Sequence, residues 1–448
     1  MSRVHEFRLD VADPVDVVFD WHRRTGALAR LLPPWQPVRI VQEAADLRDG
    51  VTVLGFPAGR TWVAQHLADE YVDGRQFADR LTSRPFVLPI AWHHRHDFEA
   101  DGSGSAVVDR VTTAVPDAFL REMFAFRHRQ LAADLAAHRR TADLPHLTVA
   151  VTGSSGLVGS ALVPFLTTGG HRVVRLVRRP PSAPDERRWD PERPDAEALA
   201  GIDAVIHLAG APIAGRFTAQ HKERIRSSRV GPTRLLAEAA RTASVPVFVS
   251  ASAIGFYGAD RGDEAVDEGA APGEGFLAEV VRDWEAAALV GAESGSAMRV
   301  VLIRTGIVQS PRGGALRLQR PLFAAGVGGP IGNGRQWVSW IGIDDLLDIY
   351  LRALTDPGLH GAVNAVAPEA VRQKQYAATL GRVMHRPAVL PTPRLGPRIL
   401  LGREGEHEVA LASQRVVPTE LLDRGHTFRF PQLEPALAHL LGGSVGAS

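Results

Sequence analysis

The segment 147–159 constrains this chain most, because it joins an apolar, β-branched run to a glycine-rich turn and the start of an amphipathic helix. Gly153 can adopt turn dihedrals that a side chain would forbid, Gly156 lets a phosphate approach backbone N–H groups, and Gly159 lets the helix lie close to its strand. A helix N-terminus also carries a partial positive charge. The segment therefore predicts a dinucleotide-binding turn, formed by Gly153, Ser154, Ser155, Gly156, Leu157 and Val158. The alternative is an ordinary glycine turn in a parallel α/β sheet.

Composition narrows the classes of function. A chain of 448 residues suggests two or three domains, and its 45% hydrophobic content supports globular packing. With a formal net charge of +1, the chain lacks the excess of basic residues expected of a protein that binds nucleic acid. The absence of cysteine excludes disulfides, thiolate catalysis and zinc–cysteine sites, and it fits a cytoplasmic location. Residues 1–10 lack the apolar core of a signal peptide and no apolar run is long enough to cross a bilayer, so we expect no membrane partner.

The first 140 residues carry the pattern of an antiparallel sheet. Apolar and charged residues alternate over residues 5–11. Further strand patterns, separated by turns at 73–74 and 101–104, follow at 61–71, 76–81, 91–99 and 106–115. Residues 117–140 then place their apolar side chains on one helical face. We predict a curved antiparallel sheet that grips one long helix, an α+β helix-grip domain over residues 1–140.

This order of elements, with the runs Phe77-Ala78-Asp79-Arg80-Leu81 and Trp92-His93-His94-Arg95-His96-Asp97-Phe98, resembles the START-like or polyketide-cyclase-like (SRPBCC) family. The resemblance implies an apolar cavity between sheet and helix, with an apolar ligand as its occupant. His94 and His96 share one face of a strand, whereas His93 points the other way. No partner carboxylate spacing completes a metal site, so we predict no metal and expect a solvated or hydrogen-bonded strand face.

Polar residues and a proline over 141–146 predict a linker. A Rossmann-type doubly wound parallel sheet is expected over 147–356, and a small C-terminal substrate lobe over 357–448. The second strand of that sheet, 172–177, ends in Arg178 and Arg179, where an NAD-specific fold would place an acid. Two guanidinium groups suit a 2′-phosphate, so we predict NADP, with NAD as the alternative cofactor. The competing interpretation is that the arginine pair only solvates a strand end.

Further parallel strands are predicted at 203–210, 245–252 and 298–308, with one helix over 220–242 between the first two. Asp344 and Asp345 are expected to cap a helix that runs to 355. Ligands bind at the carboxyl ends of parallel strands. We therefore expect additional cofactor contacts from Leu208, Ala209, Gly210, Ser250, Arg304, Thr305 and Gly306.

The run 250–258, together with the glycine turn, resembles an extended short-chain dehydrogenase/reductase. In that family a serine on this strand orients the substrate oxygen, and a tyrosine four residues before a lysine on the next helix transfers the proton. Ser252 fits the serine, but Phe276 and Val280 stand where the tyrosine and lysine belong. The pair has not moved elsewhere, because Lys222 and Lys374 are the only lysines and neither follows a tyrosine by four residues.

Tyr257 is the tyrosine nearest to Ser252 in this run, so we predict Ser252 and Tyr257 as the catalytic residues. Arg261 lies four residues beyond Tyr257 and would lower its pKa, in a stretch that we expect to be a loop. The acids of that loop, Glu264 and Glu268, are expected to be solvated. The alternative for Tyr257 is a packing role at the edge of the sheet.

Several short sequence motifs across residues 147–441 together resemble the atypical epimerase family, whose members are often labelled nucleoside-diphosphate-sugar epimerases and carry a C-terminal domain of unknown function. These motifs are Val151-Thr152-Gly153, Trp189-Asp190-Pro191, Ser228-Arg229-Val230, Ser250-Ala251-Ser252-Ala253, Phe276-Leu277-Ala278, Asp283-Trp284-Glu285, Arg304-Thr305-Gly306-Ile307-Val308, Gly313-Gly314-Ala315-Leu316, Trp337-Val338-Ser339-Trp340-Ile341 and, in the appended domain, Ser413-Gln414-Arg415-Val416.

The leading hypothesis is an NADP(H)-dependent oxidoreductase or epimerase that acts on a small carbonyl or hydroxyl compound. The alternative is a module that binds NADP(H) or another ligand without hydride chemistry, which the missing tyrosine and lysine favour. A cell-division regulator is a third class, suggested by a family label alone. The sequence indicates neither the substrate nor the oligomeric state.

Overall fold

The computed structural model describes residues 2–85, 90–292, 297–391 and 395–443. The chain divides into two compact units, Met1–Pro145 with Val163–His171 and His146–Leu162 with Arg172–Ser448. We call them the N-terminal unit and the Rossmann unit, and each is described by itself. Among the described residues, no helix is both long and apolar enough to cross a bilayer.

The N-terminal unit holds an antiparallel sheet in the order β1-β7-β6-β5-β4-β3-β2. Its strands are β1 (Arg3–Val11), β2 (Arg39–Gln42), β3 (Val51–Gly55), β4 (Thr61–His66), β5 (Gln76–Leu81), β6 (Trp92–Asp101) and β7 (Gly104–Thr113). A tight turn joins β6 to β7, and Gly102 takes the positive φ of 58° that this turn requires. The predicted sheet is present, and two of its strands, β2 and β3, lie outside the predicted strand ranges.

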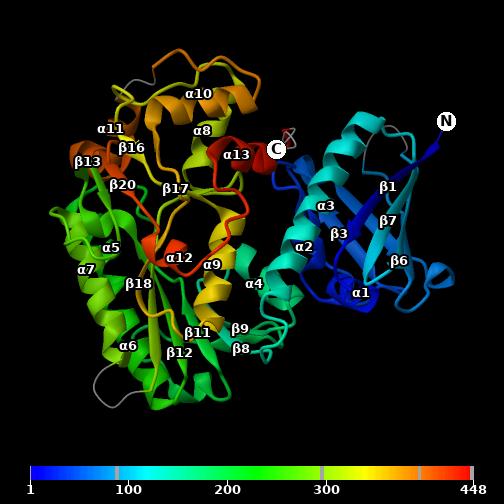
Figure 1. Cartoon of the computed structure of the whole chain (residues 1–448), viewed down its shortest axis with the longest axis horizontal. Coiled ribbons are helices and arrows are strands. Elements are labelled where there is room, and N and C mark those ends of the chain that lie inside the picture. The colour runs from blue at the N-terminus through cyan, green and yellow to red at the C-terminus, as the bar shows by residue number, and fades with distance from the viewer. Residues whose placement is uncertain (1, 86–89, 293–296, 392–394, 444–448) are drawn as a thin grey trace. The chain divides into compact units, whose positions relative to one another are not determined.

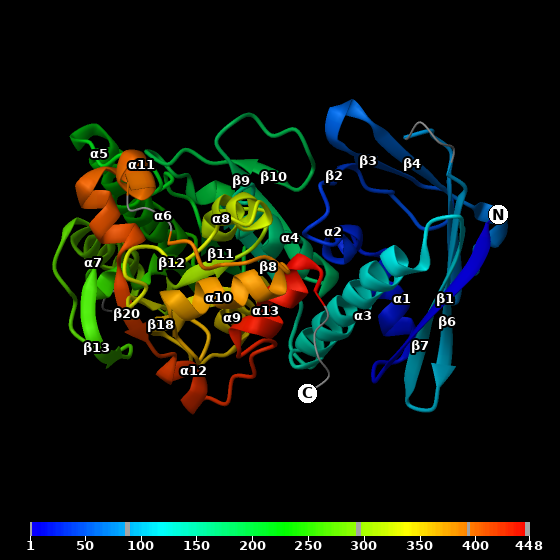
Figure 2. The same ribbon diagram turned by 90° about the horizontal axis from the view of Figure 1, so that it is seen from above.

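Three helices cover one face of this sheet: α1 (Val15–Arg23), α2 (Ala27–Leu31) and the 23-residue α3 (Asp117–Arg139). Figure 2 shows α3 crossing that face. Short 3-10 turns, η1 (Pro57–Gly59) and η2 (Ala68–Glu70), lie between strands. Apolar side chains from the sheet and from the helices form the core, among them Phe19, Trp21, Phe77, Phe98 and Leu131. Alternation along the strands and helical spacing along α3 therefore direct their apolar faces at one another.

The Rossmann unit is built on a parallel sheet in the order β10-β9-β8-β11-β12-β14-β18 (Figure 1). Its strands are β8 (Thr148–Thr152), β9 (Arg172–Val177), β10 (Glu186–Arg188), β11 (Ala204–His207), β12 (Val247–Ala253), β14 (Arg299–Thr305) and β18 (Gly361–Ala365). Successive strands proceed outward from β8 first on one side and then, from β11, on the other. This is the doubly wound order, and its switch point lies between β8 and β11.

Helices flank the parallel sheet, with α6 and α7 on one face and α9 on the other (Figure 1). The longer helices of residues 146–443 are α4 (Gly159–Thr168), α5 (Ala219–Ser227), α6 (Val230–Thr242), α7 (Phe276–Leu289), α8 (Gly314–Ala324), α9 (Ile343–Thr355), α10 (Gln373–Val383), α11 (Leu395–Gly405), α12 (Thr419–Asp423) and α13 (Leu433–Leu441). Short turns are η3 (Ala196–Leu199), η4 (Ile254–Tyr257), η5 (Val290–Ala292) and the π-helical η6 (Glu406–Ala410).

A single helix was predicted over 220–242, but the structure has two, α5 and α6. The chain turns between them at Arg229, which has a φ of −111° and a ψ of −59°. The Arg229 guanidinium donates to the carbonyl of Ala211, and Ser228 accepts from the amide of that residue. These contacts with the β11–α5 connection hold the break in place.

Three pairs of short strands complete the unit: β13 (Asp260–Val266) with β20 (Ser413–Val416), β15 (Ile307–Gln309) with β17 (Trp340–Gly342), and β16 (Trp337–Val338) with β19 (Val371–Arg372). The stretch around Glu264 is thus a strand, not the expected loop.

Asp345 was predicted to cap α9 and does not do so. It is buried and accepts from the backbone amides of Arg429 and Phe430, and burial raises its pKa to about 7.

Candidate functional site

The glycine turn after β8 has the geometry of a phosphate cradle. Gly153 has a φ of 66°, and a Cβ on it would stand 2.8 Å from the carbonyl carbon of Leu208. A Cβ on Gly159 would stand 2.3 Å from the carbonyl oxygen of Gly153. The amide of Gly156 closes the turn by donating to the same oxygen at 2.9 Å. Only glycine fits these positions, and the turn leads directly into the N-terminus of α4, so the segment fits a dinucleotide pyrophosphate.

A buried polar network ties the end of β11 to this turn. Oγ1 of Thr152 lies 2.8 Å from Nδ1 of His207 and accepts from the amides of Leu208 and Ala209. Nε2 of His207 lies 3.0 Å from Oγ1 of Thr233. Burial lowers the pKa of His207 to about 3, so its ring is neutral and can accept from Thr152. The network holds Leu208 and Ala209 beside the glycine turn.

The two arginines that follow β9 differ in what they can contact. Arg179 makes a two-pronged ion pair with Glu186 of β10, with N–O distances of 2.8 and 2.6 Å, and it also donates to Ser182. Arg179 and Ser182 hold the pKa of Glu186 down at about 2. Arg178 is exposed and has no hydrogen bond or ion pair in the described part of the chain. Arg178 is therefore the guanidinium available to an incoming phosphate.

Ser252, at the carboxyl end of β12, belongs to a buried ion-pair network. Its hydroxyl donates to Oε1 of Glu285 in α7 at 2.5 Å. Arg304 of β14 donates to both oxygens of the same carboxylate, each at 2.8 Å. The side chains of Arg304 and Glu285 are only 5% and 7% exposed. Because charges at this depth are costly unless paired, the carboxylate and the guanidinium hold each other in place.

Tyr257 joins this network from the turn η4. Its hydroxyl donates to Oδ1 of Asn364 at 2.7 Å and accepts from Arg304 at 3.0 Å. The side chain is fully buried, and burial raises the pKa of Tyr257, although Arg304 acts in the opposite direction. Arg261, expected to act on Tyr257, donates to Glu264 and makes no hydrogen bond to Tyr257 among the described residues. The guanidinium at the Tyr257 hydroxyl belongs to Arg304.

The other residues predicted to border a cofactor lie on β12 and β14 or directly after β14. Ser250 is buried and donates to the carbonyl of Ala251. The side chain of Arg304 already donates to Glu285 and Tyr257, so a ligand could contact this residue only through its backbone. Thr305 donates to the carbonyl of Ile303, and a Cβ on Gly306 would stand 2.8 Å from the carbonyl oxygen of Ser339.

Three members of the network, Glu285, Asn364 and Glu268, are not among the predicted site residues. Glu285 belongs to one of the motifs that carry the family resemblance, without a predicted role, and no motif contains Asn364. Glu268, expected to be solvated, is half-buried and accepts from the amides of Asn364 and Glu420. Burial raises its pKa. A usable signal was present, since an acid on the apolar face of α7 needs a buried partner.

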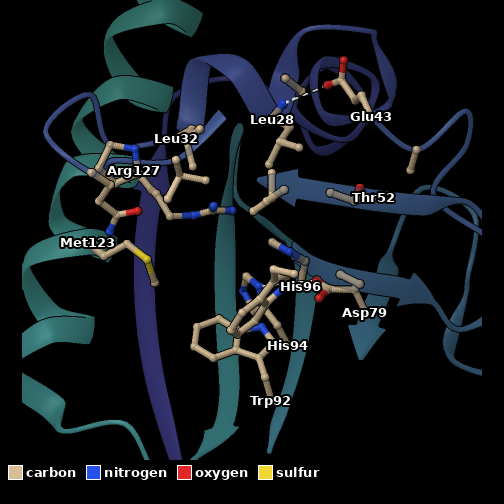
Figure 3. A pocket seen from close by; sticks show the side chains of 18 of the residues that line it. Leu28, Leu32, Glu43, Thr52, Asp79, Trp92, His94, His96, Met123 and Arg127 are labelled. Atoms are coloured by element: carbon tan, nitrogen blue, oxygen red, sulfur yellow. Dashed lines mark hydrogen bonds and ion pairs between the residues drawn. The ribbon is translucent and has the colours of Figure 1, made fainter. Parts of the chain in front are cut away.

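The N-terminal unit contains a cavity of about 920 Å³ between the sheet and α3. Its wall is mainly apolar, and one part carries polar side chains that include His22, His66, Asp79, His94 and His96. Figure 3 shows Asp79, His94 and His96 on neighbouring strands, with Arg127 reaching in from α3. The sequence pattern showed no carboxylate at a spacing that would complete a metal site with His94 and His96. In the structure Asp79 supplies such a carboxylate, because β5 places it directly opposite His94.

Comparison with known proteins gives consistent matches for the Rossmann unit. The model of the NAD dependent epimerase/dehydratase family matches residues 149–365, and a domain of unknown function, DUF1731, matches residues 392–440. An epimerase family protein of Mycobacterium bovis is 40% identical over 299 residues, which are 66% of this chain and 98% of the relative.

Two solved structures extend the comparison. A crystal structure described as the nucleoside-diphosphate sugar epimerase from Corynebacterium glutamicum is 42% identical, with a TM-score of 0.86 over 98% of this chain and 90% of that one. The human epimerase family protein SDR39U1, solved with NADPH, is 32% identical and has a TM-score of 0.61, covering 66% of this chain and 99% of its own. The first match spans both units, and the second covers about two thirds of this chain.

Proposed function

Because the chain belongs to the NAD dependent epimerase/dehydratase family, we propose that its Rossmann unit binds NADP(H) and acts on a small hydroxyl or carbonyl compound. The observation that carries the proposal is the turn at Gly153. Its left-handed backbone and its contact with Leu208 leave no room for a side chain at the switch point of a doubly wound sheet.

Arg178 supports NADP(H) over NAD(H). It follows β9, where this fold recognises the ribose 2′ position, and its guanidinium has no partner among the described residues. A phosphate there would accept charge-assisted hydrogen bonds from it. The human relative solved with NADPH is consistent with this choice.

Ser252 and Glu285 offer a route for a proton that does not need the tyrosine–lysine pair. When bound, the nicotinamide accepts or supplies the hydride. In alcohol oxidation the substrate hydroxyl passes its proton to Oγ of Ser252 while the Ser252 proton moves to Glu285, 2.5 Å away. Carbonyl reduction runs the same transfers in reverse. Tyr257 acts through Arg304 in this proposal, since its hydroxyl already bonds on both sides.

The second candidate is a module that binds NADP(H) without turnover. The full burial of Tyr257 favours it, because no tyrosine hydroxyl of this network is open to a substrate. For the N-terminal unit we propose a START-like fold that holds an apolar ligand in its cavity, and for residues 357–448 a lobe on the substrate side.

The test is turnover by matched variants. Fluorescence titration with NADPH and NADH measures cofactor preference, and equal affinities would remove the argument from Arg178. NADPH oxidation is then screened against a panel of aldehydes, ketones and keto sugars for the wild type, Ser252→Ala and Tyr257→Phe. We expect Ser252→Ala to lose about 100-fold or more in kcat while still binding NADPH. Binding without turnover of any compound by the wild type would favour the second candidate.

A further inference from the structure

We propose that Asp79, His94 and His96 bind a divalent first-row transition-metal ion at the wall of the cavity in the N-terminal unit. The proposal concerns a different unit from the NADP(H) site and does not depend on the proposed function.

Strand pairing brings the three side chains together. Asp79 of β5 is the register partner of His94 of β6, and His96 follows two residues along the same strand, on the same face. Each of the three offers one ligand atom within 4.8 Å of the other two. Nδ1 of His94 lies 3.7 Å from Oδ2 of Asp79, close enough for an ion to bridge them after a small side-chain adjustment.

Asp109 of β7 orients the imidazoles from behind. It is buried, and its Oδ1 accepts from Nε2 of His94 at 2.9 Å, which leaves Nδ1 of that ring directed at Asp79. Its other oxygen lies 2.8 Å from Nε2 of His128. A carboxylate behind a metal-binding imidazole fixes the ring orientation and raises its basicity. Asp109 has the position of such an outer partner.

A buried nitrogen on the neighbouring strand β4 is an independent indication of a ligand. Nδ1 of His66 has no hydrogen-bond partner among the described residues, and His66 is the register partner of Asp79. Nδ1 of His96 lies 2.7 Å from Oδ1 of Asp109, so the same carboxylate contacts both imidazoles of β6. The His66 ring is only 8% exposed. Buried polar atoms normally find partners, and a cation would supply one.

The charges and donor types define the ion. Two carboxylates, Asp79 and Asp109, lie near one guanidinium, Arg127, so these three side chains together carry a negative formal charge. Two imidazoles and a carboxylate suit Zn²⁺ and its first-row neighbours better than Ca²⁺ or Mg²⁺, which prefer oxygen ligands alone. Three protein ligands leave coordination positions open. Water or an oxygen atom of a cavity ligand would fill them.

The test uses the full chain after treatment with chelator. Titration with Co²⁺ is followed by its visible absorption and by calorimetry, and Zn²⁺ is then added as competitor. The variants are Asp79→Asn and His96→Gln. The control is His93→Gln, since His93 directly precedes the ligand His94 on β6 but points to the other face and pairs with Glu70 at 2.9 Å. Circular dichroism checks that every variant is folded.

We expect one Co²⁺ per chain in the wild type and in His93→Gln. Asp79→Asn and His96→Gln should lose at least the roughly 10–100-fold in affinity that removal of an outer-shell partner costs. X-ray absorption of the wild-type Zn²⁺ complex needs no variant and should show imidazole scattering with ligand distances of about 2.0–2.1 Å. Failure to bind one equivalent, a spectrum without imidazole, or equal affinity in Asp79→Asn and His93→Gln would overturn the proposal.

Discussion

Replacing Glu285 by glutamine removes the charge at the centre of the network that joins α7 to β12 and β14. Glutamine keeps the volume of the side chain and one oxygen that can accept from Ser252 or Arg304. It leaves the Arg304 guanidinium, 5% exposed, without a carboxylate. Breaking a buried ion pair from one side costs about 3–5 kcal/mol. Because one hydrogen bond can persist, we expect the lower part of that range, about 3 kcal/mol.

Glu279→Gln is the matched control, since it makes the same chemical change on the same helix. Glu279 lies 3.4 Å from Arg226, and these side chains are 54% and 33% exposed. A solvated pair of this kind contributes no more than about 1 kcal/mol. Hydrogen exchange of peptides from β12 and β14 in increasing urea measures the unfolding free energy of this unit by itself.

The double variant Glu285→Leu with Arg304→Met separates pairing from packing. Replacing both charges by apolar side chains of similar volume is often neutral, so the double variant should be more stable than Glu285→Gln. If Glu285→Gln and Glu279→Gln both lost less than about 1 kcal/mol, the buried pair would not contribute as the geometry requires, and the reasoning would be refuted.

The remaining predictions concern the cofactor turn, the arginine pair and one buried acid. Gly153→Ala should abolish NADPH binding in fluorescence titration and destabilise the fold by more than Gly201→Ala, which shares the positive φ, 69° against 66°, but has open space around its Cβ; equal losses would contradict the steric argument. Arg178→Ala should weaken NADPH binding by roughly tenfold or more and leave NADH unchanged, whereas Arg179→Ala should lower the urea midpoint, and the reverse pattern would exchange their roles. The folded-state pKa of Asp345, about 7, lies above its ordinary 3.8, so the folded protein binds the extra proton between these values. The Asp345 contribution to stability is therefore largest at low pH and falls as pH rises towards 7, by at most roughly 1.4 kcal/mol per pH unit, and Asp345→Asn should remove that slope from urea midpoints measured at pH 5 and 8.

Local patterns predicted the backbone well. Strand β9 runs over the predicted 172–177, β5 over the predicted 76–81, and α3 ends one residue before its predicted end. These elements follow from alternation or helical spacing within a few residues, and such patterns depend little on distant contacts. The predicted helix 220–242 failed at Arg229 for the opposite reason, because its break is held by Ala211, outside the helix.

Side-chain partners were predicted poorly. Glu285 lies 33 residues after Ser252 and 19 before Arg304, and no local pattern connects positions so far apart. Tyr257 was given Arg261, four residues away, as its cation, whereas strand pairing supplied Arg304. In the N-terminal unit, the spacing of His94 and His96 was visible, but Asp79 joined them only when β5 paired with β6.

The sequence by itself determined that a glycine turn follows a buried strand at 153–159, and that a sheet with one long helix precedes it. Those features are set by which dihedrals and which buried faces a short segment allows. Only the tertiary structure decided that Arg178 is open while Arg179 is paired, and that Ser252 donates to Glu285. The partner of a buried charge is chosen by strand register and by the loss of water around it, and neither exists until the chain has folded.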